Sequence, residues 1–395
     1  MAFEQTWRWF GPKDPYKLKE IKQTGATGIV SALHQIPVGE IWSKEDIIER
    51  KNIIESEGFN WSVVESLPVH ENIKKRKNNF KKIIENYKTS LINLSQCGID
   101  TVCYNFMPVL DWSRTDLQVI NHDGSISSKF DSTAFRTFDL FILKRKDSEM
   151  DYTSVQIEES KKYYNKLSQV EIDNLISTVL YGLPGSMDAY SLNDFKYALS
   201  EYNEIGKHEL RNNLYEFIKE IISTAEESNL NLAIHPDDPP WSLLGLPRVV
   251  GIRNDLTNIL NSVETNNNGL TFCTGSLGVN INNDVVEMAK QFSSRVNFIH
   301  LRNVVRNVSG DFKETYHLEG DIDLYSIVKE FLLEQKRRME IGRKDYRMPM
   351  RPDHGHLLYP DFNGENIYPG YSLVGRLKGL AELRGLELGI TRTLF

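Results

Sequence analysis

Short apolar runs recur along most of the chain, separated by longer stretches with the spacing of amphipathic helices. Six of these runs predict strands, at residues 29–33, 61–65, 100–106, 229–235, 268–273 and 296–300. A weaker seventh candidate lies near residues 316–320, and an eighth ends at residues 351–353. Between the first two runs, Ser43 is a suitable N-cap for a helix that extends to about Glu57.

The alternation of strands and helices predicts parallel strands joined by crossover helices, and eight such units predict a (β/α)8 barrel. We interpret residues 1–395 as one barrel domain. Residues 113–228 break the rhythm, because they form a long, polar segment with mostly helical patterns. This segment predicts an insertion after the third strand, lying over one end of the barrel.

Composition narrows the class of protein. The chain has 395 residues, of which 40% are hydrophobic and 26% charged, as in ordinary globular proteins. A formal net charge of −7 argues against nucleic acid as the main partner. The N-terminus lacks the pattern of a signal peptide, and no apolar run has membrane-spanning length. With only three cysteines, a disulfide framework is not expected, so the sequence predicts a cytoplasmic protein without a membrane partner.

Four predicted strands end in residues that commonly bind metals. His235, Cys273, His300 and Asp353 each follow an apolar run, so each should lie at the same rim of the barrel. Imidazole, thiolate and carboxylate groups are ligands of first-row transition metals. One histidine after a strand is usually structural, but four ligand-type residues at four strand ends favour a metal site. This ligand set is compatible with zinc, iron(II) or manganese(II).

Polar residues beside these candidates could bind a substrate. Arg302 and Asn303 follow His300 and could hold a carboxylate or hydroxyl groups, although Arg302 could equally form a surface ion pair. Asp237, with its neighbour Asp238, could orient a ligating histidine, and a capped turn is the competing interpretation. Arg351, two residues before Asp353, is a further candidate for substrate binding.

An acid/base pair is a second hypothesis. His354 follows Asp353 directly, and Tyr371 lies in a Pro-Gly-Tyr turn farther along the chain. A histidine and a tyrosine near a metal can transfer protons. Taken alone, His354 could belong to a polar loop and Tyr371 could be a packed aromatic residue.

Seven motifs in order resemble those of the mannonate dehydratase family: RWFG (8–11), GATG (25–28), HPDDPP (235–240), CTGS (273–276), IHLRN (299–303), HLEGD (317–321) and MRPDHGH (350–356). The resemblance covers essentially the whole chain. It implies a xylose-isomerase-like TIM barrel with a helical insertion, and dehydration of D-mannonate to 2-keto-3-deoxy-D-gluconate in hexuronate breakdown. It further implies manganese(II) or iron(II) as cofactor, bound by the four strand-end residues, with His354 and Tyr371 as acid and base in unassigned order.

Two rival functions are considered alongside this one. Another sugar isomerase or epimerase on the same barrel would not need an arginine that binds a carboxylate. A non-catalytic sugar- or metal-binding protein would bind the metal and turn over no sugar acid. A homo-oligomer, dimer or higher, is also expected.

Overall fold

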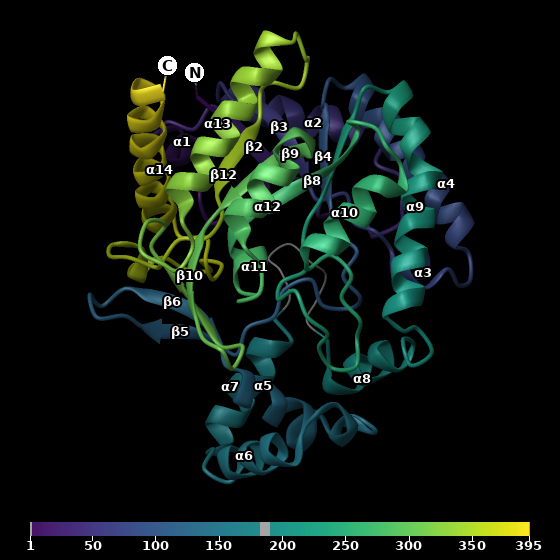
Figure 1. Cartoon of the computed structure of the whole chain (residues 1–395), viewed down its shortest axis with the longest axis vertical. Coiled ribbons are helices and arrows are strands. Elements are labelled where there is room, and N and C mark those ends of the chain that lie inside the picture. The colour runs from purple at the N-terminus through teal and green to yellow at the C-terminus, as the bar shows by residue number, and fades with distance from the viewer. Residues whose placement is uncertain (1, 182–189, 395) are drawn as a thin grey trace.

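Eight parallel strands form a closed barrel in the computed structural model, which describes residues 2–181 and 190–394 (Figure 1). Around the barrel the strands follow the order β1-β12-β9-β8-β7-β4-β3-β2. The predicted (β/α)8 barrel is confirmed. Its strands are β1 (Glu4–Arg8), β2 (Gly28–Ser31), β3 (Asn60–Glu65), β4 (Thr101–Tyr104), β7 (Asn231–Ile234), β8 (Asn268–Cys273), β9 (Val296–Leu301) and β12 (Pro349–Pro352).

Helices connect these strands and cover the outside of the barrel. The connecting helices are α1 (Leu18–Lys22), α2 (Lys44–Ser56), α3 (Glu71–Lys75), α4 (Phe80–Gln96), α9 (Lys207–Glu227), α10 (Arg253–Ser262), α11 (Thr274–Gly278), α12 (Val285–Phe292) and α13 (Leu324–Glu340), and α14 (Leu373–Leu394) follows the last strand. Ser43 is the N-cap of α2, where its side chain accepts a hydrogen bond from the Asp46 backbone N–H. This local capping agrees with the helix start predicted from the sequence.

The strands are buried on both faces, which explains why they appear in the sequence as continuous apolar runs. Side chains that point outward join the main core with the helices, as Ile29 and Val102 do. Side chains that point inward form a separate group, which we call the interior cluster: Val30, Val63, Cys103, Ala233 and Phe298. The barrel interior is therefore packed with side chains at this level.

The eighth barrel strand comes from the N-terminus, which corrects the prediction of a strand near residues 316–320. Strand β1 pairs with β12 at Glu4–Pro349 and with β2 at Thr6–Gly28. Its sequence, EQTWR, is mostly polar and lacks the apolar run used to recognise the other strands. Residues 316–319 follow the short strand β11 (Phe312–Thr315), which belongs to a second sheet.

This second sheet has the strand order β10-β11-β6-β5. Strands β5 (Asp116–Ile120) and β6 (Ile126–Phe130) form a hairpin within the predicted insertion, and β10 (Asn303–Arg306) with β11 follows barrel strand β9. Phe130 of β6 stacks on Phe312 of β11, with ring centroids 5.4 Å apart. The sheet thus ties the segment after β4 to the segment after β9.

The rest of the predicted insertion is helical where the structure describes it. It contains α5 (Ser132–Thr137), a π-helix (Phe138–Leu143), a short 3-10 helix (Ser148–Asp151), α6 (Ser154–Tyr164), α7 (Gln169–Val179) and α8 (Leu192–Ser200), while residues 182–189 lie outside the described part. In Figure 1, α5, α6 and α7 form a lobe at the lower end of the molecule, away from both chain termini. The last helix of the predicted range, α9, packs against α4 beside the barrel.

Within residues 2–181 and 190–394, none of the helices combines the length and the apolar character that crossing a lipid bilayer requires.

Candidate active site

The polar layer of the site lies directly above the interior cluster. Successive inward-facing positions on a strand are two residues apart. Four members of the interior cluster are each followed, two positions later along the strand, by a polar residue. These polar residues are Glu65, Asn105, His235 and His300. The strands therefore change from apolar to chemically active side chains within one step, at the carboxyl end of the barrel, where barrel enzymes carry their active sites.

Three of the four predicted metal ligands converge tightly. One ligand atom from each of His235, Cys273 and His300 lies within 4.8 Å of the other two. The closest pair is His235 Nε2 and His300 Nδ1, which are 3.2 Å apart. Bonds of roughly 2.0–2.3 Å to one ion place its ligand atoms within about 4.6 Å of each other. The three side chains therefore have a spacing that fits a single metal ion.

The surroundings of these side chains leave the converging atoms available. His235 Nδ1 lies 2.7 Å from the Pro236 carbonyl oxygen, so Nε2 is the nitrogen that faces the site. His300 Nε2 lies 3.5 Å from Glu65 Oε2, which leaves Nδ1 facing the site. Such partners fix the orientation and the tautomer of ligating histidines. The Cys273 sulfur accepts hydrogen bonds from the hydroxyl (3.1 Å) and backbone N–H (3.5 Å) of Ser276.

Asp353, the fourth predicted ligand, adjoins this group. Its Oδ2 lies 3.4 Å from Cys273 Sγ, and its Oδ1 lies 3.8 Å from His300 Nδ1. Burial alone would raise the pKa of this carboxyl, but His354, Arg351, His300 and Arg302 together lower that pKa well below its usual value. Asp353 is therefore a carboxylate at neutral pH and adds negative charge beside two imidazoles and a thiol.

Three of the predicted substrate-binding residues lie behind the cavity rather than in it. Arg302 directs Nη1 to Glu314 Oε1 (2.8 Å), Nε to Asp353 Oδ2 (2.8 Å) and Nη2 to Asp238. The Asn303 side chain donates to the carbonyl oxygens of two later residues in the same loop. Asp237 is fully buried and accepts a hydrogen bond from a backbone N–H at 2.8 Å. Their polar atoms are used in holding loops together, which a linear sequence does not reveal.

Arg351, the remaining predicted substrate-binding residue, does line the cavity. Its Nε and Nη2 form a two-pronged ion pair with Glu65, at 3.0 and 2.9 Å. Its Nη1 lies 2.7 Å from Asp353 Oδ1 and donates to the Asp353 carbonyl oxygen at 3.0 Å. Arg351 thereby links the carboxylates beside the candidate metal ligands and fixes their positions.

The predicted acid/base pair meets in the cavity. The rings of His354 and Tyr371 pack edge to face, with centroids 5.2 Å apart. His354 Nδ1 lies 2.8 Å from Glu314 Oε1, a residue of β11, so its Nε2 is turned toward Asp353 Oδ1 at 3.9 Å. Burial raises the pKa of Tyr371 to about 12, against the opposing effect of Arg351 and Arg8. The phenol therefore keeps its proton at neutral pH.

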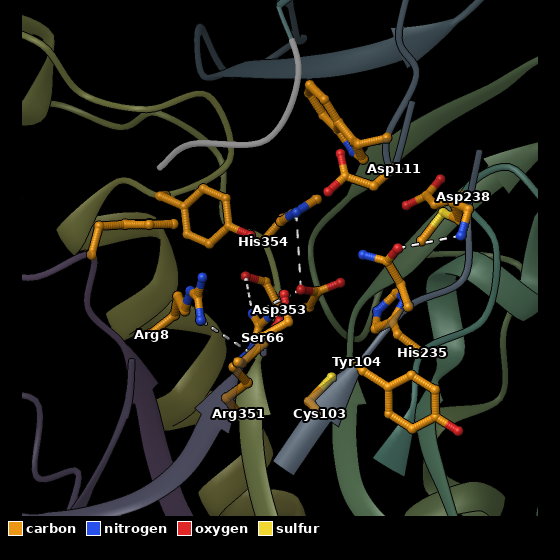
Figure 2. Close-up of a pocket in the computed structure, with 16 residues that line it drawn as sticks. Arg8, Ser66, Cys103, Tyr104, Asp111, His235, Asp238, Arg351, Asp353 and His354 are labelled. Carbon is orange, nitrogen blue, oxygen red and sulfur yellow. Dashed lines mark hydrogen bonds and ion pairs between the residues drawn. The ribbon is translucent and has the colours of Figure 1, made fainter. Parts of the chain in front are cut away.

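One cavity is lined by Arg351, Tyr371, His235, Asp353 and His354, with free space of about 560 Å³, part of which is open to solvent. Figure 2 shows Arg8 and His235 on opposite sides of it, with His354 above and Cys103 below. Further lining residues are Phe10, Ser66, Tyr104, Asn105, Met107, Asp111, Trp112 and Asp238. A concave site of this size, with a few polar groups and perturbed pKa values, suits a small polar ligand.

Several residues of the site were not predicted from the sequence. Arg8 and Glu65 end strands β1 and β3, and Glu314 lies on β11 of the second sheet. Glu65 could have been found, since it ends a predicted strand as the metal-ligand candidates do. Arg8 and Glu314 could not, because the strands that carry them have no clear apolar run.

Comparison with known proteins shows the family. The model of the D-mannonate dehydratase (UxuA) family matches residues 3–395. The mannonate dehydratase of Marinomonas sp. (strain MWYL1) is 50% identical over 392 residues, which are 99% of this chain and 100% of that protein. The crystal structure of mannonate dehydratase from Streptococcus suis serotype 2 superposes with a TM-score of 0.76 at 34% identity, covering 99% of this chain and 94% of that one.

A more distant solved structure shares the fold alone. D-psicose 3-epimerase from Clostridium cellulolyticum H10 has a TM-score of 0.51 and 11% identity, over 98% of this chain and 99% of that chain. The barrel is thus shared by proteins named for different activities, and the site residues have to decide the chemistry.

Proposed function

Because the chain belongs to the D-mannonate dehydratase family, we propose that it converts D-mannonate to 2-keto-3-deoxy-D-gluconate and water in hexuronate breakdown. The observation that carries the proposal is the position of His354 and Tyr371, which share a cavity with His235, a member of the cluster with Cys273 and His300. Dehydration of an aldonate needs a base for the proton on carbon 2 and an acid for the hydroxyl on carbon 3.

His354 is suited to be the base. With Nδ1–H donating to the Glu314 carboxylate, Nε2 carries a lone pair that can accept the carbon 2 proton. Negative charge then develops on the substrate carboxylate as the carbon 2 proton leaves. Burial alone would raise the pKa of Glu314, but His354, Arg302 and Arg114 lower that pKa well below its usual value. Glu314 is therefore a carboxylate, and its negative charge stabilises the imidazolium that results.

Tyr371 is suited to be the acid. Its phenol is protonated at neutral pH, because burial raises its pKa to about 12. It can donate this proton to the carbon 3 hydroxyl as the carbon–oxygen bond breaks, and that hydroxyl leaves as water. The enol product then tautomerises to the keto acid, so one substrate gives one keto-deoxy acid and one water.

We further propose manganese(II) or iron(II) as the cofactor, held by His235, Cys273, His300 and Asp353. The mixed nitrogen, sulfur and oxygen donors and their close spacing support this assignment. When bound, the ion would supply Lewis-acid stabilisation of the negative charge that develops on the substrate. The free thiols of Cys97, Cys103 and Cys273 support the cytoplasm as the compartment. Assembly into a homo-oligomer stays a prediction.

The test is an assay of the purified protein with D-mannonate and added manganese(II) or iron(II), with the keto-deoxy acid detected by mass. Formation of that acid, with loss of one water, is the expected result. An epimerised or isomerised sugar without loss of water would support the rival enzyme class instead. Metal binding without any turnover of D-mannonate would support the non-catalytic rival.

A further inference from the structure

The charged groups around the cavity are paired almost completely, and the pairing can be followed atom by atom. Glu65 receives both prongs of Arg351, and Asp353 receives Arg351 Nη1 and Arg302 Nε. A carboxylate that already lies against two guanidinium nitrogens has less need of a third cation.

A second group of ion pairs joins Arg114 and Arg302 to Asp238 and Glu314. Arg114 places Nη1 3.0 Å from Asp238 Oδ1 and Nη2 2.8 Å from Glu314 Oε1. Arg302 binds the same two carboxylates from the other side. Burial opposes ionisation of Asp238, yet Arg114 and Arg302 lower its pKa to about 2. The terminal guanidinium nitrogens of Arg114 and Arg302 are therefore engaged by carboxylates inside the protein.

Arg8 is the exception among the cavity's guanidinium groups in the described part of the chain. Its side chain is only 8% exposed, and its Nη1 is buried without a hydrogen-bond partner among the described residues. The nearest carboxylate oxygen, Glu65 Oε2, is 4.0 Å away and already accepts from Arg351 Nε at 3.0 Å. Burial of an unpaired charged donor is costly unless a ligand completes it.

Apart from its long contact with Glu65, the position of Arg8 is fixed by two other neighbours. Its backbone carbonyl accepts a hydrogen bond from Arg376 Nη1 at 2.8 Å, and its guanidinium lies 4.8 Å from the centroid of the Phe10 ring. Figure 2 shows the side chain reaching into the pocket from the side opposite His235 and Asp238. A rigidly held, unsaturated guanidinium at one end of a cavity is suited to bind an anion.

We propose that Arg8 binds the carboxylate end of the substrate and is the residue that selects sugar acids over uncharged sugars at this site. This inference rests on the proposed function, and it moves to Arg8 the role that the sequence had suggested for Arg302. A guanidinium can form two parallel hydrogen bonds with a carboxylate, which fixes the orientation of the substrate as well as its charge. Arg351 lines the same cavity, but its donors are occupied by Glu65 and Asp353.

The experiment compares two ligands that differ only in charge, D-mannonate and its uncharged amide, D-mannonamide. Binding is measured by calorimetry in a His354→Asn background, which slows turnover about 10²–10⁴-fold, with manganese(II) present. In that background, Arg8→Gln is expected to weaken D-mannonate binding about 10- to 100-fold, the usual effect of losing charged hydrogen bonds. D-mannonamide binding should change less than about 3-fold, because it offers no charge to Arg8.

Arg384→Gln is the matched control, since Arg384 contacts the same N-terminal strand from outside the barrel, with Nε 2.7 Å from Gln5 Oε1. It should leave both affinities unchanged. Arg8→Lys keeps the charge and should fall between the wild type and Arg8→Gln, and it serves as the test if circular dichroism shows that Arg8→Gln does not fold. Equal losses for the acid and the amide, or no loss for either, would overturn the proposal.

Failure of this inference can be told apart from failure of the proposed function. If the wild-type protein forms the keto-deoxy acid while Arg8→Gln loses both ligands equally, the function stands and the role of Arg8 falls. If the wild type forms no product but binds D-mannonate through Arg8, the anion site stands and the dehydratase proposal falls. If the wild type binds D-mannonate no more tightly than D-mannonamide, the site does not recognise the negative charge, and the proposed anion site is wrong.

Discussion

At the scale of single residues, Cys273 offers the sharpest test of the metal site. Cys273→Ser replaces the soft thiolate by a poor ligand, so we expect loss of most bound metal and activity, with the barrel still folded. Metal content per chain, measured by atomic emission after dialysis, checks this. Cys97→Ser is the matched control, because Cys97 caps α4 away from the cavity. Equal metal content in both variants would remove Cys273 from the ligand set.

Lowering the pH gives a second test of the proposed metal site. A metal bound by His235 and His300 must compete with protons, because only neutral imidazoles are ligands. Metal affinity should therefore fall as the pH is lowered. Titration of the protein with manganese(II) at a series of pH values measures it, and an affinity independent of pH from 8 to 5 would contradict imidazole ligation.

The proposed roles of His354 as base and Tyr371 as acid can be tested separately. His354→Asn and Tyr371→Phe nearly preserve size, so both should keep metal and substrate binding while each loses about 10²–10⁴ in turnover. His354→Asn should also stop exchange of the carbon 2 proton with deuterated solvent. Tyr371→Phe should still exchange it, since deprotonation does not need the phenol. Proton magnetic resonance of recovered substrate reads out the difference, and the opposite pattern would exchange the two roles.

At the scale of secondary-structure elements, helix α14 carries an unusual acid against the N-terminal strand. Glu387 is only 3% exposed, its Oε1 has no hydrogen-bond partner among the described residues, and burial raises its pKa to about 7. Gln5 Nε2, on β1, is 3.5 Å from its other oxygen. The folded protein thus holds a proton that the unfolded chain releases near pH 4.5.

This raised pKa sets the sign of a stability change. Folding takes up a proton between about pH 4.5 and 7, so the contribution of Glu387 to stability falls as the pH rises through that window. Glu387→Gln lacks the titration and should be more stable than the wild type at pH 8, by roughly 1–3 kcal/mol. At pH 4 the two should be nearly equal. Denaturant unfolding at both pH values measures this, and a Glu387→Gln protein that is less stable at pH 8 would contradict it.

The elements also show which features a sequence can and cannot reveal. Strands β7, β8 and β9 were predicted with their terminal ligands, because burial on both faces demands an apolar run and the active residue ends it. Strand β1 was missed because its polar residues are buried by partners distant in sequence. The buried ion pairs of Arg302 could not be predicted for the same reason. Its charge is balanced by Asp238 and by Glu314 of the second sheet, which only the folded chain brings near.

At the scale of the whole molecule, β1 closes the barrel between the first and last thirds of the chain. It pairs with both β2 and β12, so removal of residues 2–8 should leave two open sheet edges and expose apolar surface. We expect that truncated chain to aggregate or to lose its cooperative unfolding transition, as judged by circular dichroism. Arg8→Gln in the full chain keeps the strand and should unfold cooperatively. A truncated chain that melts as the full chain does would show that β1 is dispensable.

The closure by β1 also constrains how the protein is made in the cell. The ribosome releases Glu4 among its first residues, while its partner Pro349 comes near the end. At roughly 5–20 residues per second, the first strand waits for tens of seconds for the last one. Arg8, at the end of that strand, likewise precedes Asp353 by nearly the whole of translation. No nascent chain that stops short of Asp353 can therefore contain a complete site, and catalytic power arises only after that residue has been synthesised.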